Sequence, residues 1–325
     1  MTRNGAETKD NVDRIAIIIP ALNEGLSIVE NLRVIRSHVI AVENCQVSLV
    51  VVDDGSSDNT AEQVLMCREQ DPDVYLLCLN RHFGKEAAIS AGLRALHSFD
   101  AVVVMDSDLQ HPPSLLPEMI AQWRKGSAVV EAVKSSRGSE SAVKGSLVKV
   151  YYRLFNYLTR INISGDTDFK LLDQEVVQSV NALPEHGRFF RGLIKWMGYS
   201  TSSLAFDVPA STRQGSNWGG AALFKYALSS ITSFTAFPLQ LVSLMGVLTF
   251  LISVVFGFMA LSDKLSGQAV DGFTTVILLL LIIGSVLMFS VGLIGAYIGR
   301  IYDEVKRRPN FVRDNKRSIL PEGDK

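Results

Sequence analysis

The stretch AVVVMDSDLQHPP at residues 101–113 decides the fold. It begins with five apolar residues, three of them valines, and continues with two aspartates, Asp106 and Asp108, separated by one residue. A short continuous apolar run is typical of a buried parallel strand. Because alternate residues of extended backbone point to the same side, both carboxylates are expected to face one way at the end of this strand.

The same pattern repeats on the amino-terminal side of this stretch. Further apolar runs predict strands at residues 15–19, 47–52 and 74–79. Helices are expected to alternate with these strands, over residues 26–39, 60–69 and 85–96. This alternation predicts a doubly wound α/β sheet, in which ligands bind beyond the carboxyl ends of the strands.

The segments that follow the four strands are acidic and polar. They are residues 20–24, 53–58, 80–81 and 106–110. Taken singly, a run such as Asp-Gly-Ser-Ser-Asp is also typical of a turn that caps the next helix. Convergence of four such loops on one edge of the sheet favours a binding site.

The Asp106 and Asp108 pair indicates a divalent cation. Mg²⁺ and Mn²⁺ favour oxygen ligands, and Mg²⁺ held by one or two carboxylates usually completes its shell with substrate phosphates. Gln110 adds a further side-chain oxygen two residues on. The pattern therefore predicts Mg²⁺ or Mn²⁺ together with a nucleotide diphosphate.

Composition and motifs exclude other classes. The 325 residues include 32 Lys and Arg against 33 Asp and Glu, which excludes binding of nucleic acid through bulk positive charge, and 47% are hydrophobic, which excludes a disordered chain. Lys85 follows Gly84 without the rest of a P-loop, which excludes a P-loop ATPase. No Gly-x-Gly-x-x-Gly follows the first strand, so a dinucleotide-binding oxidoreductase loses its main support. Three cysteines without paired spacing favour a reducing compartment.

Two long apolar runs predict transmembrane helices. Residues 239–261 and 273–298 contain no charged residue, and each run exceeds the roughly 20 residues that a spanning helix needs. The alternative is a hairpin of buried core helices in a soluble protein. The connector 262–271 holds one Lys, whereas residues 300–317 hold seven Lys or Arg, so the tail and residues 1–236 are both expected in the cytoplasm.

Two segments before or beside the spans have the pattern of interfacial amphipathic helices, residues 147–161 and 221–237. For residues 147–161 the alternative is an ordinary surface helix. The chain is thus predicted to contain a catalytic core at 1–140, acceptor-side and membrane-interface helices at 141–236, two transmembrane helices at 237–300 and a basic tail at 301–325. An amphipathic surface beside only two spans is compatible with a homo-oligomer.

Four motifs in order carry a resemblance to a known family. They are IIIPALNE at 17–24, VVDDGSSD at 51–58, NRHFGKEAA at 80–88 and DSDLQHPP at 106–113. With them the chain resembles a family 2 glycosyltransferase of the GT-A fold. The runs DTDFKL at 166–171, FFRGL at 189–193 and GRIYDEVKRRP at 299–309, with the two spans, make it similar to bacterial polyisoprenyl-phosphate glycosyltransferases of the undecaprenyl-phosphate glucosyltransferase type. The resemblance covers about residues 13–312.

The resemblance implies roles on the donor side. The nucleotide pocket would be lined by Pro20, Leu22 and Glu24, and Asp53 or Asp54 would bind the base or ribose. Lys85 would lie near the donor. Ligands of the metal that binds the diphosphate would be Asp106, Asp108 and Gln110. The neighbouring His111 is expected to be a loop side chain rather than a ligand.

The family resemblance also implies roles for residues on the acceptor side. Arg137 would hold the acceptor phosphate, and Arg213 and Ser216 would contribute from a loop in which Asn217 and Trp218 replace the usual Lys-Tyr pair. Asp168 resembles the catalytic carboxylate, acting as a base or by positioning the acceptor. The alternative for Asp168 is an N-cap of a helix over 171–180.

The expected reaction is inverting transfer of a hexose to undecaprenyl phosphate at the cytoplasmic face of a bacterial inner membrane. UDP-glucose is the favoured donor by resemblance, while UDP-N-acetylglucosamine, a modified pentose and GDP-mannose stay open. A lipid phosphate is already largely anionic at neutral pH, since the second pKa of a phosphomonoester is about 6. The alternative from a different class is a component that transports a lipid-linked sugar without making it.

Overall fold

The computed structural model describes residues 12–134, 156, 165–185, 189–207, 235, 237–266 and 272–323. These residues belong to two compact units. The first contains the described residues up to 207 together with residues 309–323, and the second contains residues 235–308 where they are described.

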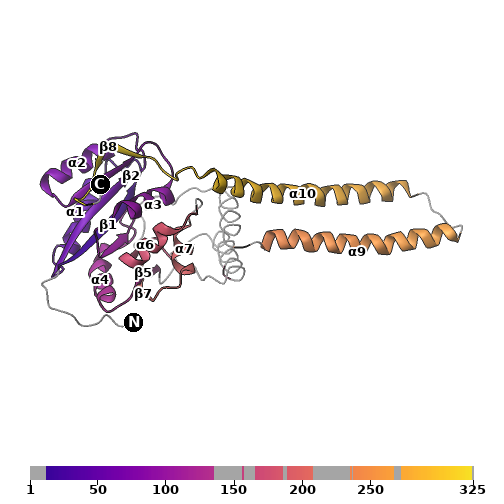
Figure 1. Cartoon of the computed structure of the whole chain (residues 1–325), viewed down its shortest axis with the longest axis horizontal. Helices are drawn as coiled ribbons and strands as arrows, with labels where there is room; N and C mark the ends of the chain where they lie inside the picture. The colour runs from indigo at the N-terminus through magenta and orange to yellow at the C-terminus, as the bar shows by residue number, and fades with distance from the viewer. Residues whose placement is uncertain are drawn as a thin grey trace. The chain divides into compact units, whose positions relative to one another are not determined.

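The first unit is built on one β-sheet (Figure 1). The sheet has eight strands in the order β7-β5-β6-β4-β1-β2-β3-β8. Strands β1 to β4 pair in parallel, whereas β6 and β8 run antiparallel to their neighbours. The strands are β1 (Asp13–Ala21), β2 (Cys45–Asp53), β3 (Val74–Leu79), β4 (Ala101–Val104), β5 (Val129–Lys134), β6 (Lys170–Asp173), β7 (Thr201–Phe206) and β8 (Arg313–Ile319).

Helices cover both faces of the sheet. One face carries α1 (Ile28–Val39), α2 (Thr60–Gln70) and α4 (Leu116–Arg124), which follows the 3-10 turn η1 (Pro113–Leu115). The other face carries α3 (Lys85–Ala95), α6 (Gln174–Ala182) and α7 (Phe190–Trp196). In β1, Ile17 packs into the first core and Ile18 into the second, which explains why the predicted strands are continuously apolar.

The predicted α/β class is confirmed, and the four predicted strands and three helices are present. Sequence analysis missed β8, which lies inside the segment interpreted only as a basic tail. This strand pairs antiparallel with β3 at the sheet edge. Cys78 N–H donates to Ser318 Oγ at 2.9 Å, and Asn80 N–H donates to the Val312 carbonyl at 2.9 Å.

The second unit contains two long helices, α9 (Phe237–Leu265) and α10 (Phe273–Lys306). Within them, Leu239–Met259 and Ile282–Lys306 are long and apolar enough to cross a membrane, by length and composition. Side chains such as Phe250, Phe258 and Met288 are more than half exposed, so these are not the buried core helices of the alternative interpretation.

The two predicted amphipathic segments lie almost entirely outside the described residues, as do the predicted domain boundaries at 140 and 236.

Candidate active site

The first two strand-end loops are joined by side-chain hydrogen bonds. Asn23, whose φ is 55°, accepts the Ser57 N–H on its Oδ1 at 2.9 Å and donates its own N–H to Ser56 Oγ at 2.9 Å. Gly25 N–H donates to Asp58 Oδ2 at 3.0 Å. Asn tolerates this left-handed backbone better than most residues. The Asp-Gly-Ser-Ser-Asp run therefore forms a turn, as one of its two interpretations predicts. It also holds the loop that follows β1 in place.

The residues predicted to line the nucleotide pocket lie on this joined pair of loops. Pro20 is half-buried near the end of β1, and Leu22 is exposed. Glu24 accepts a hydrogen bond from Ser27 Oγ at 2.7 Å on its carboxylate. Leu22 thus presents an apolar side chain to solvent just beyond the end of β1.

Asp53 and Asp54 differ in their surroundings. Asp54 accepts the N–H groups of Phe83 and Gly84 at 2.8 and 2.9 Å, and His82 Nδ1 lies 2.8 Å from its Oδ2. It is therefore an anchor for the loop between β3 and α3. Asp53 accepts the Ser56 N–H at 3.0 Å on Oδ1, and its buried Oδ2 makes no hydrogen bond.

Close packing of two loops explains Gly55. Its φ is +73°, and an added Cβ would lie 2.3 Å from the carbonyl carbon of Arg81 and 2.6 Å from His82 N. Any other residue would push apart the loops that follow β2 and β3. The glycine thus keeps Asp54 in reach of the loop that leads to Lys85.

A chain of four alternating charges runs across the strand ends. Lys85, the first residue of α3, lies 2.5 Å from Asp106 Oδ1 and 2.6 Å from Asp168 Oδ2 through its Nζ. Arg191 on α7 pairs with Asp168 through two nitrogens, Nε to Oδ1 at 2.6 Å and Nη2 to Oδ2 at 2.8 Å. Two of the predicted donor residues, Lys85 and Asp106, are thereby brought into one cluster with the predicted catalytic carboxylate.

Electrostatics keep the centre of this cluster ionised. Burial raises the pKa of Asp168, but the hydrogen bonds and charges of Arg191 and Lys85 outweigh it and hold that pKa well below its usual range. Burial lowers the pKa of Lys85, and the charges of Asp106 and Asp168 more than offset this, so it lies above its usual value. Both groups are charged at neutral pH.

Glu86, next to Lys85, has a different state. Burial and the negative charge of Asp168 raise its pKa to about 7. Its Oε2 accepts the Phe190 N–H at 3.0 Å, which ties α3 to the start of α7. The charge of this carboxyl group therefore changes close to neutral pH.

A second cluster of charged side chains is centred on the fully buried Lys170. Lys170 contacts Asp166 and lies 3.1 Å from Glu131 Oε2. Lys195 on α7 also lies 3.1 Å from Glu131, and Ser203 Oγ donates to it at 2.9 Å. Arg191 and Lys195 are one turn apart, so α7 is attached to the sheet by two ion pairs.

Asp168 is not a helix cap, because Asp173 occupies that position. Its side chain accepts the Glu175 N–H at 3.0 Å, at the start of α6. The alternative interpretation of Asp168 is therefore wrong.

The loop after β4 contains the predicted metal ligands. Asp108 is half-buried and accepts the Gln110 N–H on Oδ1 at 3.1 Å, and Asp106 Oδ2 lies 3.8 Å from His111 Nδ1. His111 is buried and stacks on Phe169, with ring centroids 5.4 Å apart. Burial lowers its pKa, so the ring is neutral, and its Nδ1 makes no hydrogen bond.

This set of side chains fits Mg²⁺ or Mn²⁺ in part. Among the described residues, no group of three His, Cys, Asp or Glu side chains is arranged to hold a metal ion. Two carboxylates from one loop are nevertheless the usual protein share of a Mg²⁺ shell that substrate phosphates and water complete. Asp106 and Asp108 lie with Gln110 on one loop, as such a share requires, and His111 next to them is a buried loop side chain stacked on Phe169.

The predicted acceptor residues Arg137, Arg213 and Ser216 lie outside the described residues. The structure adds residues that sequence analysis gave no role: Arg191, Glu86, Lys170 and Glu131. The sequence signal for a buried ion pair at Lys170 is its position between Phe169 and Leu171 in an apolar strand. Arg191 is the third residue of the FFRGL motif at 189–193, to which the resemblance assigns no chemistry.

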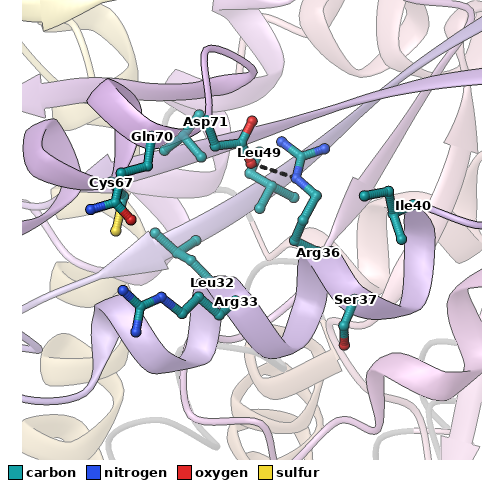
Figure 2. A pocket seen from close by; sticks show the side chains of 10 residues that line it. Leu32, Arg33, Arg36, Ser37, Ile40, Leu49, Cys67, Gln70 and Asp71 are labelled. Atoms are coloured by element: carbon teal, nitrogen blue, oxygen red, sulfur yellow. Dashed lines mark hydrogen bonds and ion pairs between the residues drawn. The ribbon is translucent and has the colours of Figure 1, made fainter.

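One cavity among these elements lies elsewhere. It has a volume of about 420 Å³ and is lined by α1 and α2 with Asp71 and Val74, at the amino-terminal ends of the strands (Figure 2). Arg36 Nε pairs with Asp71 Oδ2 at 2.6 Å across it. None of the predicted site residues lines this cavity.

Comparison with known proteins identifies the family. Residues 16–179 match the family model described as glycosyl transferase family 2, which spans every strand-end loop described above and Asp168. The chain belongs to glycosyl transferase family 2. The enzyme class predicted from the motifs, a glycosyltransferase with an α/β fold of the GT-A type, is thereby confirmed.

Relatives of this family 2 glycosyltransferase match along almost its whole length. An uncharacterized glycosyltransferase of Synechocystis sp. is 34% identical over 92% of this chain and 94% of that protein. The bactoprenol glucosyl transferase of Shigella phage SfII is 33% identical over 92% of this chain and 97% of that protein. Glucosyl-3-phosphoglycerate synthase of Mycobacterium tuberculosis, solved with Mg²⁺ and UDP, has 20% identity and a TM-score of 0.45 over 68% of this chain and 79% of that one.

Proposed function

We propose that this enzyme transfers a hexose from a nucleotide sugar to a polyprenyl phosphate. The observation that carries the proposal is the similarity over 92% of the chain to proteins described as bactoprenol glucosyl transferases, since bactoprenol is a polyprenol. By that similarity the favoured reaction is transfer of glucose from UDP-glucose to undecaprenyl phosphate. Transfer from UDP-N-acetylglucosamine, a modified pentose donor or GDP-mannose is the alternative within the same site.

The site supports this chemistry from both sides. On the donor side, Pro20, Leu22 and Glu24 would line the nucleotide pocket and Asp53 would bind the base or ribose, while Lys85 Nζ lies 2.5 Å from Asp106 Oδ1. Asp54 supports the same site through the loop that it holds. A Mg²⁺ or Mn²⁺ ion at Asp106, Asp108 and Gln110 would stabilise the charge that develops on the departing diphosphate.

On the acceptor side we retain Arg137, Arg213 and Ser216 for the lipid phosphate. Asp168 stays the proposed catalytic carboxylate, and its low pKa favours positioning over proton transfer among the two roles that the sequence leaves open. In-line attack by the lipid phosphate on the anomeric carbon would invert that centre.

The pairing of β8 with β3 supports the proposed topology. This pairing joins residues from before and after α9 and α10 in one sheet, so both must lie on the same side of any membrane that the two helices cross. The excess of Lys and Arg in the tail favours the cytoplasmic face of a bacterial inner membrane. The four-part domain division, the interfacial helices and a homo-oligomer are part of the same proposal.

The test is a transfer assay on the full-length protein in detergent. Undecaprenyl phosphate, Mg²⁺ or Mn²⁺ and each of the four donors are incubated with the protein, and the lipid product is weighed by mass spectrometry. We expect a hexose on the lipid with UDP-glucose, and no product without the metal or the lipid. A protein that consumed no donor under any of these conditions would instead support the transport alternative.

A further inference from the structure

Asp168 lies behind the two cations that it binds. Its side chain is 6% exposed, against 42% for Lys85 and 29% for Arg191. Oδ1 accepts from Arg191 Nε, and Oδ2 accepts from both Arg191 Nη2 and Lys85 Nζ. A substrate that enters the strand-end site therefore meets the cations before it meets this carboxylate.

We propose that Lys85 and Arg191 bind the phosphate groups of the substrates directly, and that Asp168 is a positioning residue that holds the two cations side by side. The proposal rests on the proposed function, which makes phosphates the substrates. It gives Arg191 a role that neither the sequence motifs nor the family match assigns, since Arg191 lies beyond residues 16–179.

The chemistry of the two cations suits a phosphate. A guanidinium presents a planar fork of N–H donors that matches two oxygens of a carboxylate or a phosphate. Arg191 binds Asp168 through Nε and Nη2, and its Nη1 donates to the Asp166 carbonyl at 3.4 Å, so a phosphate would bind Arg191 by sharing or displacing these contacts. Lys85 adds a point charge that lies between Asp106 and Asp168, hence between a proposed metal ligand and the guanidinium.

Charge balance also favours this arrangement. Two carboxylates, Asp106 and Asp168, pair with the two cations Lys85 and Arg191. An Asp whose pKa lies far below neutrality is a weak base, and an acceptor phosphomonoester with a second pKa of about 6 needs none. What the reaction requires is orientation of two anionic groups that repel each other.

The phosphate that Arg191 contacts has two sources, the nucleotide diphosphate or the lipid monophosphate. Two probes separate them without any turnover. Inorganic pyrophosphate with Mn²⁺ represents the diphosphate whatever the base, and farnesyl phosphate represents the lipid phosphate. Binding of each to the full-length protein in detergent is measured by isothermal titration calorimetry.

Three variants and one control decide the matter. Arg191→Gln and Lys85→Gln are each expected to weaken at least one probe by about tenfold or more, the loss typical of a hydrogen bond to a charged group. Arg191→Lys, which keeps the charge but lacks the fork, should weaken the same probe by less. The control is Lys195→Gln, which removes an equal charge from the same helix. Lys195 is 25% exposed and pairs with Glu131, so its loss should change neither affinity by more than about twofold.

Asp168→Asn separates positioning from proton transfer. It keeps the shape and removes the counter-charge, so affinity for the probe of Arg191 should be equal or higher while kcat falls. The inference is overturned if the wild-type protein binds neither probe, or if Arg191→Gln remains folded by circular dichroism and binds both as wild type does. Failure of the proposed function is a different result, namely binding of the probes without any lipid-linked sugar in the transfer assay.

Discussion

The buried cluster around Lys170 provides the sharpest prediction about stability. Lys170 is fully buried, contacts Asp166 and lies 3.1 Å from Glu131. Lys170→Met keeps a side chain of similar length and removes the charge. Asp166, whose side chain is also fully buried and whose Oδ2 already makes no hydrogen bond, then loses its ion-pair partner.

The expected loss follows from the cost of an uncompensated buried charge. Breaking a buried ion pair by removing one partner costs about 3–5 kcal/mol. For a domain of about 200 residues, each kcal/mol lowers the Tm by about 2–4 °C, so the variant should unfold about 6–20 °C below wild type. Burial already raises the pKa of Asp166 above its usual value. If Asp166 takes up a proton once Lys170 is gone, no buried charge remains, and the loss falls at the lower end of that range.

Thermal unfolding of the full-length protein, followed by tryptophan fluorescence, measures the effect, because Trp123 is buried in the same unit. Lys170→Met/Asp166→Asn removes both charges and should recover part of the loss. Lys195→Met, with the same chemistry at a residue that is 25% exposed, should cost about 1 kcal/mol or less. A Tm of Lys170→Met within about 2 °C of wild type would refute the reasoning.

Four further predictions follow from the site and the fold. Asp108→Asn should reduce transfer by a factor of at least about one hundred at saturating Mg²⁺, and excess EDTA should abolish wild-type transfer; full activity in EDTA contradicts the metal. The pKa of Glu86 is about 7 when folded and lower when unfolded, so its protonation favours folding at low pH and this contribution is lost as the pH rises through 7. Glu86→Gln should therefore raise the Tm at pH 8 but not at pH 5, and equal shifts at both would contradict the assignment. In intact cells, an impermeant thiol reagent should label Ser266→Cys but not Asn310→Cys, and the reverse pattern would overturn the topology. Deletion of residues 311–325 should lower the Tm of the catalytic unit by several degrees, and an unchanged Tm would show that β8 is dispensable.

The strand-end loops were predictable because their signals are local. An apolar run buried on both faces of a parallel sheet must end where polar residues begin, so Asp53, Asp54 and Asp106 could be assigned to one edge without knowledge of the packing. The sequence alone did not distinguish Asp53 from Asp54. That distinction depends on the N–H groups of Phe83 and Gly84, which donate to Asp54 from a loop about thirty residues away. No local sequence pattern predicts such a contact.

The cations were harder to predict because their partners are distant in the sequence. Lys85 and Asp168 are 83 residues apart, and Arg191 reaches Asp168 from α7, 23 residues further along the chain. A single Arg in an amphipathic segment is typical of a solvated helix face. Its pairing with a buried carboxylate becomes visible only once the sheet order is known.

Strand β8 illustrates the same limit for the tail. The run RDNKRSI at Arg313–Ile319 is charged, and its side chains are mostly exposed, because an edge strand binds its neighbour through backbone groups rather than through an apolar face. Charge patterning therefore indicates a tail, while unpaired N–H and C=O groups at the edge of β3 require a partner. The partnered strand β3 leads directly into the loop that Asp54 anchors and on to Lys85. The C-terminal strand thus supports the sheet edge from which one of the two proposed phosphate-binding cations is positioned.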